Sequence, residues 1–295
     1  MRLVWIVGSV LVFAAAAACS QSPQPTTTRE PAVRPASTTL ISTATLPTPM
    51  PTLGLAEQLS PTTTWNWQLA GSLDTSVDTD LYDVDLFDVP RSTFEELKSQ
   101  GRIVICYFSA GSLETWRSDA DQFPDHIVGS PLDGWEGELW LDIRHTDVRV
   151  ALEPRFDLAA EKGCDGVEPD NVDAYLHPTG FPLTVSDQAT FNIWLAGAAS
   201  ERGLLIGLKN ALELIQELEP VFDFALNEQC HEYDECDAMR PFVDAGKPVF
   251  NAEYTDSQID AVDLAAKICA DAIRNGLQTL ILSLDLDGSF RVACN

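Results

Sequence analysis

The chain is poor in basic side chains and rich in acidic ones. Its 295 residues include 18 Lys and Arg but 45 Asp and Glu, which gives a formal net charge of -27 at pH 7. Nucleic acids and anionic membrane surfaces are bound through basic patches, so this balance argues against both as partners. The excess of acid is compatible with a cationic ligand, and equally with simple solubility outside the cell.

Several motifs that carry familiar chemistry are missing. Ser109 and Ser112 lie outside any Gly-x-Ser-x-Gly turn, which disfavours a Ser-His-Asp hydrolase. The chain has no Cys-x-x-Cys pair and its four histidines are scattered along the sequence, which disfavours a zinc site. The Gly-rich phosphate turn of dinucleotide-binding sheets is absent. Asp285-Leu286-Asp287-Gly288 lacks the rest of a calcium loop, which disfavours a calcium site. With these motifs missing, we expect no metal and no other cofactor.

The N-terminus carries a targeting signal. Residues 3–18 form an apolar run that is too short for a comfortable membrane span and ends in small residues before Cys19. This pattern resembles a bacterial lipoprotein signal, in which the cysteine becomes the lipidated first residue, and an ordinary secretory peptide is the alternative. We predict a signal segment over residues 1–19, lipidation at Cys19, and an extracellular or cell-surface protein that meets the membrane only through this anchor.

Residues 20–63 have the composition of a linker. They are rich in Thr, Pro, Ser and Ala, as in Leu46-Pro-Thr-Pro-Met-Pro-Thr. Such a segment cannot bury a core and is expected to be extended and disordered. We therefore predict a tether over residues 20–63 and a folded domain over residues 64–295.

Six cysteines remain after Cys19. An even number in an exported protein indicates disulfides, although many pairings are possible. Spacing and position favour three pairs, which are Cys230–Cys236, Cys269–Cys294 and Cys106–Cys164. The first pair would brace the loop that carries Glu228.

From residue 64 onward, short apolar runs alternate with helical patterns. The expected helices are Thr93–Gln100, Val148–Lys162, a helix capped by Ser186 or Asp187 that runs to Arg202, and Asp256–Asn275. The expected strands are Tyr82–Phe87, Ile103–Phe108, Leu139–Asp142, Gly166–Glu168, Leu204–Leu208, Phe222–Leu226, Pro248–Ala252 and Thr279–Leu284. Eight strands with intervening segments predict an α/β fold of the (β/α)8 TIM-barrel type, with Trp65–Leu69 as an extra strand before it. An open doubly wound sheet is the alternative.

Nearly every expected strand ends in polar or aromatic residues. The carboxyl ends of the strands carry the chemistry of an α/β barrel. Any one of these residues alone would be an ordinary loop or cap residue, but burying the whole set would be costly unless its members pair or bind a ligand. The candidate substrate-binding residues are Asp85, Asp88, Tyr107, Asp142, Glu168, Asn171, Lys209, Asn210, Asn227, Glu253 and Tyr254.

Two further carboxylates, Asp170 and Glu228, follow two strands in the same context. Two acidic side chains at strand ends are the minimum equipment of a glycoside hydrolase. Lys209 is expected to pair with a carboxylate such as Asp142 or Asp170 and to help keep one ionised. Glu168 is the nearest competitor for the catalytic role, because residues two apart on a strand face the same way.

The chain also resembles glycoside hydrolase family 114 over about residues 64–295. The resemblance rests on Trp67–Leu69, Tyr82–Asp88, Ile105–Ser112, Trp140–Arg144, Gly163–Asn171, Gly207–Asn210 and Asn227–Cys230, which follow in order. It implies a TIM barrel and an endo-α-1,4-polygalactosaminidase, which cuts partly deacetylated α-1,4-linked galactosamine chains of an exopolysaccharide. It also implies Asp170 and Glu228 as the catalytic carboxylates. Asp170 would be the nucleophile and Glu228 the acid and base in a retaining enzyme, whereas Asp170 would activate water in an inverting one.

The partner expected from this resemblance is a cationic amino-sugar polymer, whose ammonium groups would meet Asp85, Asp88, Asp142 and Glu253. Two other functions stay open. One is a hydrolase of the same fold that acts on another glycan, since a family fixes chemistry better than substrate. The other is a non-catalytic, lipid-anchored carbohydrate-binding protein, which the presence of both carboxylates disfavours.

Overall fold

The computed structural model describes residues 54–294. The predicted signal segment, Cys19 and residues 20–53 of the predicted tether lie outside the described residues. Residues 54–63, the end of the predicted tether, contain the short helix α1 (Leu55–Gln58), and the carbonyl of Pro61 accepts a hydrogen bond from the Gln278 side chain. No helix in the described range is long and apolar enough to cross a membrane.

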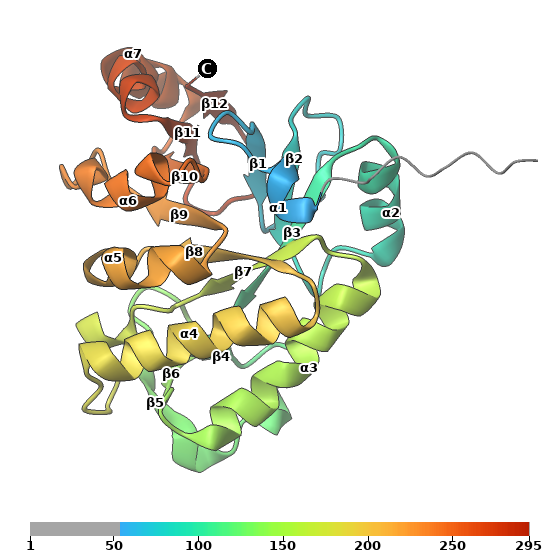
Figure 1. Ribbon diagram of the computed structural model, residues 1–295, viewed down its shortest axis with the longest axis vertical. Helices are drawn as coiled ribbons and strands as arrows, with labels where there is room; N and C mark the ends of the chain where they lie inside the picture. Colours follow the sequence, from blue (N-terminus) through green and yellow to red (C-terminus); the bar gives the residue numbers. More distant parts are fainter. Residues whose placement is uncertain (1–53, 295) are drawn as a thin grey trace, which may run out of the picture. The chain divides into compact units, whose positions relative to one another are not determined.

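Strands and helices alternate along the domain, as predicted (Figure 1). The strands are β1 (Trp65–Gln68), β2 (Leu81–Asp85), β3 (Ile103–Ser109), β4 (Ser112–Glu114), β5 (Val128–Pro131), β6 (Glu138–Leu141), β7 (Gly166–Asp170), β8 (Leu205–Lys209), β9 (Phe224–Glu228), β10 (Val249–Tyr254), β11 (Leu277–Leu282) and β12 (Arg291–Ala293). The other helices are α2 (Arg91–Ser99), α3 (Thr146–Lys162), α4 (Val185–Glu201), α5 (Ile215–Leu218), α6 (Arg240–Asp244) and α7 (Gln258–Asn275).

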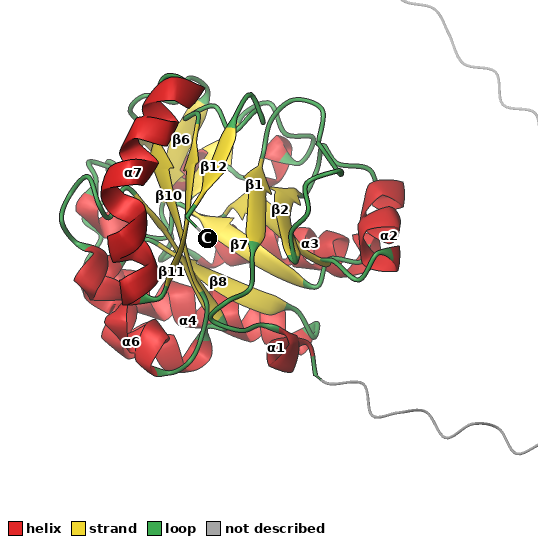
Figure 2. Ribbon diagram, turned by 90° about the horizontal axis from the view of Figure 1, so that it is seen from above, coloured by secondary structure: helices red, strands yellow, loops and turns green. Residues whose placement is uncertain are grey.

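Among the described residues, nine strands form one curled sheet in the order β1-β2-β3-β7-β8-β9-β10-β11-β12. The first eight are parallel neighbours, and β12 runs antiparallel to β11. The two ends of the sheet approach each other, since the Trp65 indole donates to the carbonyl of Gln278 at 2.8 Å and Arg291 donates to the carbonyl of Trp65 at 2.6 Å. With the helices outside the strands (Figure 2), this is the TIM-barrel arrangement that the sequence predicts.

One apolar cluster fills the space inside the strands. Its members come from β1, β2, β3, β8, β9, β10, β11 and the loop after β11, and they are Trp65, Trp67, Leu81, Ile103, Ile105, Leu205, Phe224, Leu226, Phe250, Ala252, Leu280, Leu282 and Leu286. A Cβ added at Gly207 would lie 2.2 Å from the ring of Phe224, so glycine is needed there. A cluster drawn from so many strands is the packed interior of a barrel.

The four longer helices match the predicted ones to within about three residues at each end. Thr184 caps α4, and its side chain and that of Asp187 bond each other's backbone N–H groups. Gly163 and Gly276 end α3 and α7 with left-handed backbone, which glycine adopts without steric cost. These helices pack a second apolar cluster against the outer face of the sheet.

The prediction of Leu139–Asp142 as a barrel strand is wrong. Glu138–Leu141 instead form β6, the centre of a separate antiparallel sheet in the order β4-β6-β5. The eighth parallel strand is β1, which we expected to be an extra one. Residues 110–145, between β3 and α3, therefore form an excursion from the barrel, which we call the 110–145 excursion.

The three predicted disulfides are confirmed. Cys106–Cys164 joins β3 to the residue pair before β7, Cys230–Cys236 closes the loop after β9, and Cys269–Cys294 joins α7 to the C-terminal segment. Disulfides form and persist in oxidising compartments, so these three fit an extracellular protein.

Candidate active site

A cavity of about 260 Å³ opens where the parallel strands end. It is lined by residues at or near the ends of five of these strands, which are Tyr107, Asp170, Lys209, Glu228 and Tyr254. Trp116 and Trp135 line it from the 110–145 excursion and are 55% and 49% exposed. A neighbouring hollow of about 480 Å³ shares Asp85 and Asp88 but contains neither Asp170 nor Glu228, so the candidate chemistry belongs to the smaller cavity.

Lys209 is the centre of the polar network in this cavity. Its ammonium lies 3.1 Å from Glu168 Oε1, 3.1 Å from Asp170 Oδ1 and 3.3 Å from Glu228 Oε2, and the residue is only 3% exposed. Burial works to lower the pKa of Lys209, but the charges of the three carboxylates outweigh it and raise the pKa well above its ordinary value. Lys209 is therefore a fixed cation between the two predicted catalytic carboxylates.

Asp170 ends β7 with both carboxylate oxygens occupied by donors. Lys209 donates to Oδ1 at 3.1 Å, and the Tyr107 hydroxyl donates to Oδ2 at 3.1 Å. The backbone N–H of Gly111 donates to the Asp170 carbonyl at 3.1 Å. A Cβ on Gly111 would lie 1.7 Å from the carbonyl oxygen of Asn171, so glycine is required for this close approach. The loop after β3 thus fixes the end of β7.

Glu228 ends β9 and is oriented by neighbouring strands. The Tyr254 hydroxyl donates to Oε1, and the Asn210 amide donates to Oε2 at 3.0 Å. The side-chain oxygen of Asn210, Oδ1, accepts from the Glu228 backbone N–H at 3.0 Å and from the Asn227 side-chain amide at 3.2 Å. Burial and then the charge of Glu228 raise the pKa of Tyr254 well above its usual range, so this phenol stays a donor.

A buried acid pair lies beneath Lys209. Glu168 is fully buried and accepts from the Trp67 indole at 3.1 Å. Burial raises the pKa of Glu168 to about 7, although Lys209 works in the opposite direction. Burial and then the charge of the neighbouring Glu168 raise the pKa of Asp83 well above its ordinary value. Asp83 was not among the predicted site residues, because it lies in the middle of a strand and not at its end.

Three of the strand ends that line the cavity are followed by a residue with left-handed backbone. Asn171, Asn210 and Gln229 have φ of 60°, 47° and 58°, and they follow Asp170, Lys209 and Glu228 directly. Non-glycine residues adopt this conformation seldom and at some energetic cost, and such residues cluster at functional sites. At these three positions the left-handed residue ends the strand, so that Asp170, Lys209 and Glu228 are each the last residue of their strand.

The 110–145 excursion supplies one wall of the cavity. Glu138 on β6 lines the cavity and accepts from the Ser112 hydroxyl at 2.7 Å. The Asn171 amide donates to Ser109 Oγ at 2.9 Å and lies 3.3 Å from Ser112 Oγ, which ties this wall to the end of β7. Burial raises the pKa of Glu138 to about 7; the hydrogen bond from Ser112 opposes this, and nearby carboxylates add to it. Sequence reasoning missed Glu138 because it looked for site residues at the ends of expected barrel strands, whereas Glu138 is the first residue of β6, a strand outside the barrel.

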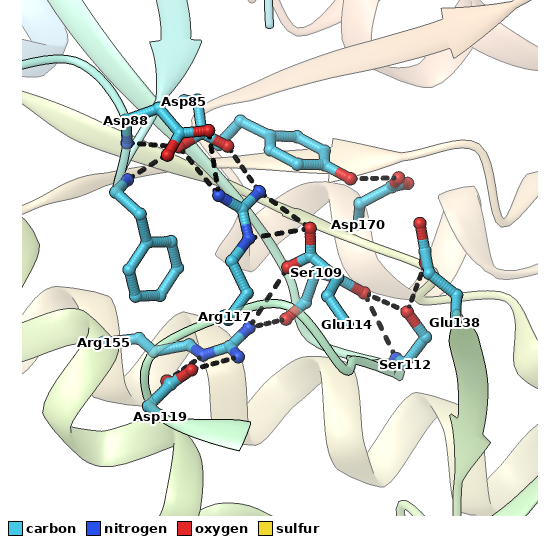
Figure 3. Close-up of polar contacts among 12 residues, drawn as sticks. Asp85, Asp88, Ser109, Ser112, Glu114, Arg117, Asp119, Glu138, Arg155 and Asp170 are labelled. Carbon is cyan, nitrogen blue, oxygen red and sulfur yellow. Dashed lines mark hydrogen bonds and ion pairs between the residues drawn. The ribbon is translucent and has the colours of Figure 1, made fainter. Parts of the chain in front are cut away.

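Arg117, also from the excursion, neutralises part of the acidic rim (Figure 3). It donates to Asp85 Oδ1 at 3.1 Å and pairs with Glu114 at 2.7 Å, and it reaches Asp88 at 3.4 Å. The cavity nevertheless stays strongly acidic. Its two basic groups are Lys209 and Arg117, and its seven carboxylates are Asp85, Asp88, Glu114, Glu138, Asp170, Glu228 and Asp285.

Residues 49–295 match the glycoside-hydrolase family GH114. The chain belongs to this family. Among solved structures, it is similar to Ega3 of Aspergillus fumigatus, crystallised in complex with galactosamine, with 42% sequence identity over 80% of this chain and 97% of that chain and a TM-score of 0.76. It is also similar in fold to the glycoside hydrolase domain of PelA from Pseudomonas aeruginosa, with 17% identity over 78% of this chain and 98% of that chain and a TM-score of 0.61. A comparison with curated protein sequences found no match. As predicted, the protein is a glycoside hydrolase.

The GH114 chain brings most of the predicted site residues together, but not all of them line the cavity. Asp142 follows β6 outside the barrel and pairs with Arg144 at 2.7 Å, not with Lys209 as we considered. Glu253 is buried, and it accepts from the His231 backbone N–H at 2.9 Å and from the Asn251 amide at 3.0 Å. Glu168, Asn210 and Asn227 do not line the cavity. Glu168 contacts Lys209, Asn210 contacts Glu228, and Asn227 in turn contacts Asn210.

Two groups of described residues have the side chains of a metal site. Cys230 and Cys236 form a disulfide and so offer no thiolate to the first group. The second group is His126, His145 and Asp147, in which the two imidazole rings are 4.8 Å apart although they are distant in sequence. Neither group is among the residues that line the cavity, so the candidate chemistry does not involve them.

Proposed function

We propose that this GH114 enzyme cleaves internal bonds of an α-linked polysaccharide that contains galactosamine, with Asp170 as nucleophile and Glu228 as general acid and base. The observation that carries the proposal is the position of these two carboxylates at the ends of β7 and β9, on either side of Lys209. Paired carboxylates that flank the scissile bond are the working parts of most glycosidases.

The geometry favours retention of configuration. Lys209 Nζ lies 3.1 Å from Asp170 Oδ1 and 3.3 Å from Glu228 Oε2, so these two oxygens can be at most about 6.4 Å apart. Retaining enzymes have their carboxyl groups about 5–5.5 Å apart, whereas inverting enzymes need about 6.5–9.5 Å to admit a water. This pair of oxygens is therefore closer than the separation expected of an inverting enzyme, which supports a covalent glycosyl-enzyme intermediate over direct attack by water.

Each chemical step then has a named group. In the first, an Asp170 oxygen attacks the anomeric carbon, the glycosidic bond breaks, and Glu228 gives its proton to the leaving oxygen. In the second, Glu228 takes a proton from water, the water oxygen bonds to the anomeric carbon, and the ester to Asp170 breaks. The negative charge moves from Asp170 to Glu228 and back. Because Lys209 contacts both, it keeps an ion-pair partner throughout.

The chemistry of the cavity fits an amino-sugar polymer. Seven carboxylates against two basic groups suit a substrate that carries ammonium groups. The exposed rings of Trp116 and Trp135 offer faces on which sugar rings stack. Ega3, the similar structure from Aspergillus fumigatus, was crystallised with galactosamine. These three observations all fit a polysaccharide that contains galactosamine.

We further propose that the enzyme works outside the cell on a lipid anchor. The apolar residues 3–18 followed by Cys19 support export, and the three disulfides support an oxidising compartment. Mass spectrometry of the membrane fraction tests the anchor, since it requires a lipid on Cys19. A protein recovered in the medium and cut elsewhere would show an ordinary secretory signal instead.

The proposed reaction is tested by incubating the full chain with partly deacetylated α-1,4-galactosaminan and detecting oligosaccharides by mass spectrometry. Asp170→Asn and Glu228→Gln serve as isosteric controls, with circular dichroism to check folding. Oligosaccharides from the wild type alone support the reaction and both residues. A folded wild type that releases none from this polymer but cuts another glycan, or merely binds one, would overturn the substrate or the enzyme assignment respectively.

A further inference from the structure

Glu138 has a carboxylate oxygen that the protein leaves without a partner. The side chain lines the cavity, yet the residue is only 6% exposed. Its Oε2 accepts from the Ser112 hydroxyl at 2.7 Å, whereas within residues 54–294 no hydrogen bond to Oε1 is found. Figure 3 shows this free oxygen pointing to the side where Asp170 lies. A buried carboxylate oxygen that faces a cavity without a donor is open to a donor from the ligand.

The other carboxylates of the cavity are either paired with a cation of the protein or exposed to water. Asp85 and Glu114 are paired with Arg117, and Asp170 and Glu228 contact Lys209. Two more carboxylates, Asp88 and Asp285, are exposed to water. Glu138 is therefore the buried cavity carboxylate, in the described part of the chain, that has no cation of the protein within ion-pair distance. Of the residues expected to meet the substrate ammonium groups, which are Asp85, Asp88, Asp142 and Glu253, Asp85 and Asp142 are already paired with arginines of the protein.

Glu138 is connected to the end of β7 by a short chain of hydrogen bonds. Asn171 follows Asp170 directly, and its amide donates to Ser109 and lies within reach of Ser112, the residue that holds Glu138. Asp170 attacks the anomeric carbon C1 of the sugar in the proposed reaction. The amino group of galactosamine is on C2, the adjacent carbon, so it must lie close to the nucleophile. We propose that Glu138 binds this ammonium group and thereby selects a free amine over an N-acetyl group or a hydroxyl at C2.

Charge and space explain the selection. An ionised carboxylate in a buried site is costly without a cation, and the ammonium of the substrate supplies both the charge and the donors. Burial, with the charges of Glu114 and Asp170 added to it, raises the pKa of Glu138 in the same way. An N-acetyl group is neutral and bulkier, so it would leave the carboxylate unpaired. A site built to bond a polar group rejects an analogue that lacks it.

This inference rests on the proposed function, and a binding experiment separates the two. The affinity of the full chain for galactosamine and for galactose, which has a hydroxyl in place of the amine, is measured by titration calorimetry. Glu138→Gln keeps the shape and the acceptor for Ser112, and Glu136→Gln, an exposed neighbour, is the matched control for the lost charge. Cleavage of fully deacetylated galactosaminan is measured alongside, with thermal unfolding as the folding check.

We expect the wild type and Glu136→Gln to bind galactosamine more tightly than galactose. We expect Glu138→Gln to lose this preference and to show kcat/KM on the deacetylated polymer lower by at least roughly 30-fold. Equal affinity of the wild type for both sugars, or an unchanged preference in folded Glu138→Gln, would overturn the role of Glu138. If the wild type cleaves the polymer in that case, the proposed function stands without it. A wild type that binds neither sugar and cuts no galactosaminan would overturn both.

Discussion

The ammonium of Lys209 lies 3.1 Å from a carboxylate oxygen of Asp170, in a site where Lys209 is almost completely buried. Replacing Lys209 with methionine removes the cation but keeps most of the side-chain volume. Glu168, fully buried below it, would then carry an uncompensated charge. We expect the free energy of unfolding at pH 7 to fall by about 3–5 kcal/mol, and polymer cleavage to be lost.

The control for this variant is Lys267→Met, an exposed position on α7. It should change the free energy of unfolding by no more than about 0.5 kcal/mol. The loss in Lys209→Met should shrink at pH 5, because Glu168 can take up a proton there. A Lys209→Met protein as stable as the wild type at pH 7 would contradict the role given to this ion pair. The measurement is urea unfolding followed by circular dichroism.

The hydrogen bond from Tyr254 to Glu228 is predicted to support catalysis. Tyr254→Phe removes the donor to Oε1 while Asn210 still holds Oε2. A hydrogen bond to a charged group contributes about 1.5–3 kcal/mol, so we expect kcat to fall roughly 10- to 100-fold. Tyr233→Phe, an exposed tyrosine, should leave kcat unchanged. Equal rates for both variants in steady-state kinetics would show that Glu228 needs no orientation by Tyr254.

Stability is predicted to decrease as the pH rises from about 5 to 7. Burial raises the pKa of Glu138 to about 7 in the folded state, whereas an unfolded Glu titrates near 4.3. Between these values the folded protein binds more protons than the unfolded chain, so rising pH favours unfolding. Glu138→Gln should reduce this decline by roughly 2 kcal/mol relative to Glu136→Gln. Urea unfolding at pH 5 and pH 7 measures it, and identical declines would mean that Glu138 titrates normally.

The three disulfides are expected to differ in their contribution to stability. Cys106–Cys164 closes a separation of 58 residues and Cys230–Cys236 one of 6. In the chain-entropy account, replacing each pair with serine costs about 4 and about 2 kcal/mol respectively. Chemical unfolding of the two double variants tests this order. A larger loss from the short loop would indicate that Cys230–Cys236 acts mainly by shaping the native segment after Glu228.

Much of the fold could be predicted because hydrophobic period and cap residues act locally. Gly163 and Gly276 ended the predicted α3 and α7 at the right residues. The mistake was Leu139–Asp142, which has the composition of a barrel strand. Its pairing with β4 and β5 depends on residues far away in the sequence, and the local pattern is the same in either sheet. For the same reason Trp65–Gln68 gave no sign that it would be the first barrel strand.

The site was predictable where a functional residue ends a parallel strand. Asp170, Lys209 and Glu228 meet because the carboxyl ends of parallel strands lie at one rim. Glu138 and Arg117 were missed because they come from the 110–145 excursion, whose path back over the rim is set by tertiary contacts such as the bond from Asn171 to Ser109. Asp142, which was selected as a strand end, belongs to a strand outside the barrel.

The most direct test of the account is the configuration of the first product. The full chain and α-1,4-galactosaminan are mixed, and the new reducing ends are observed by proton NMR before the anomers equilibrate, with Asp170→Asn in parallel. Because the Asp170 and Glu228 oxygens that face Lys209 lie at most about 6.4 Å apart, we predict α-configured ends from the wild type and none from the variant. First products in the β configuration, or undiminished cleavage by Asp170→Asn, would contradict the assignment of Asp170 as the nucleophile.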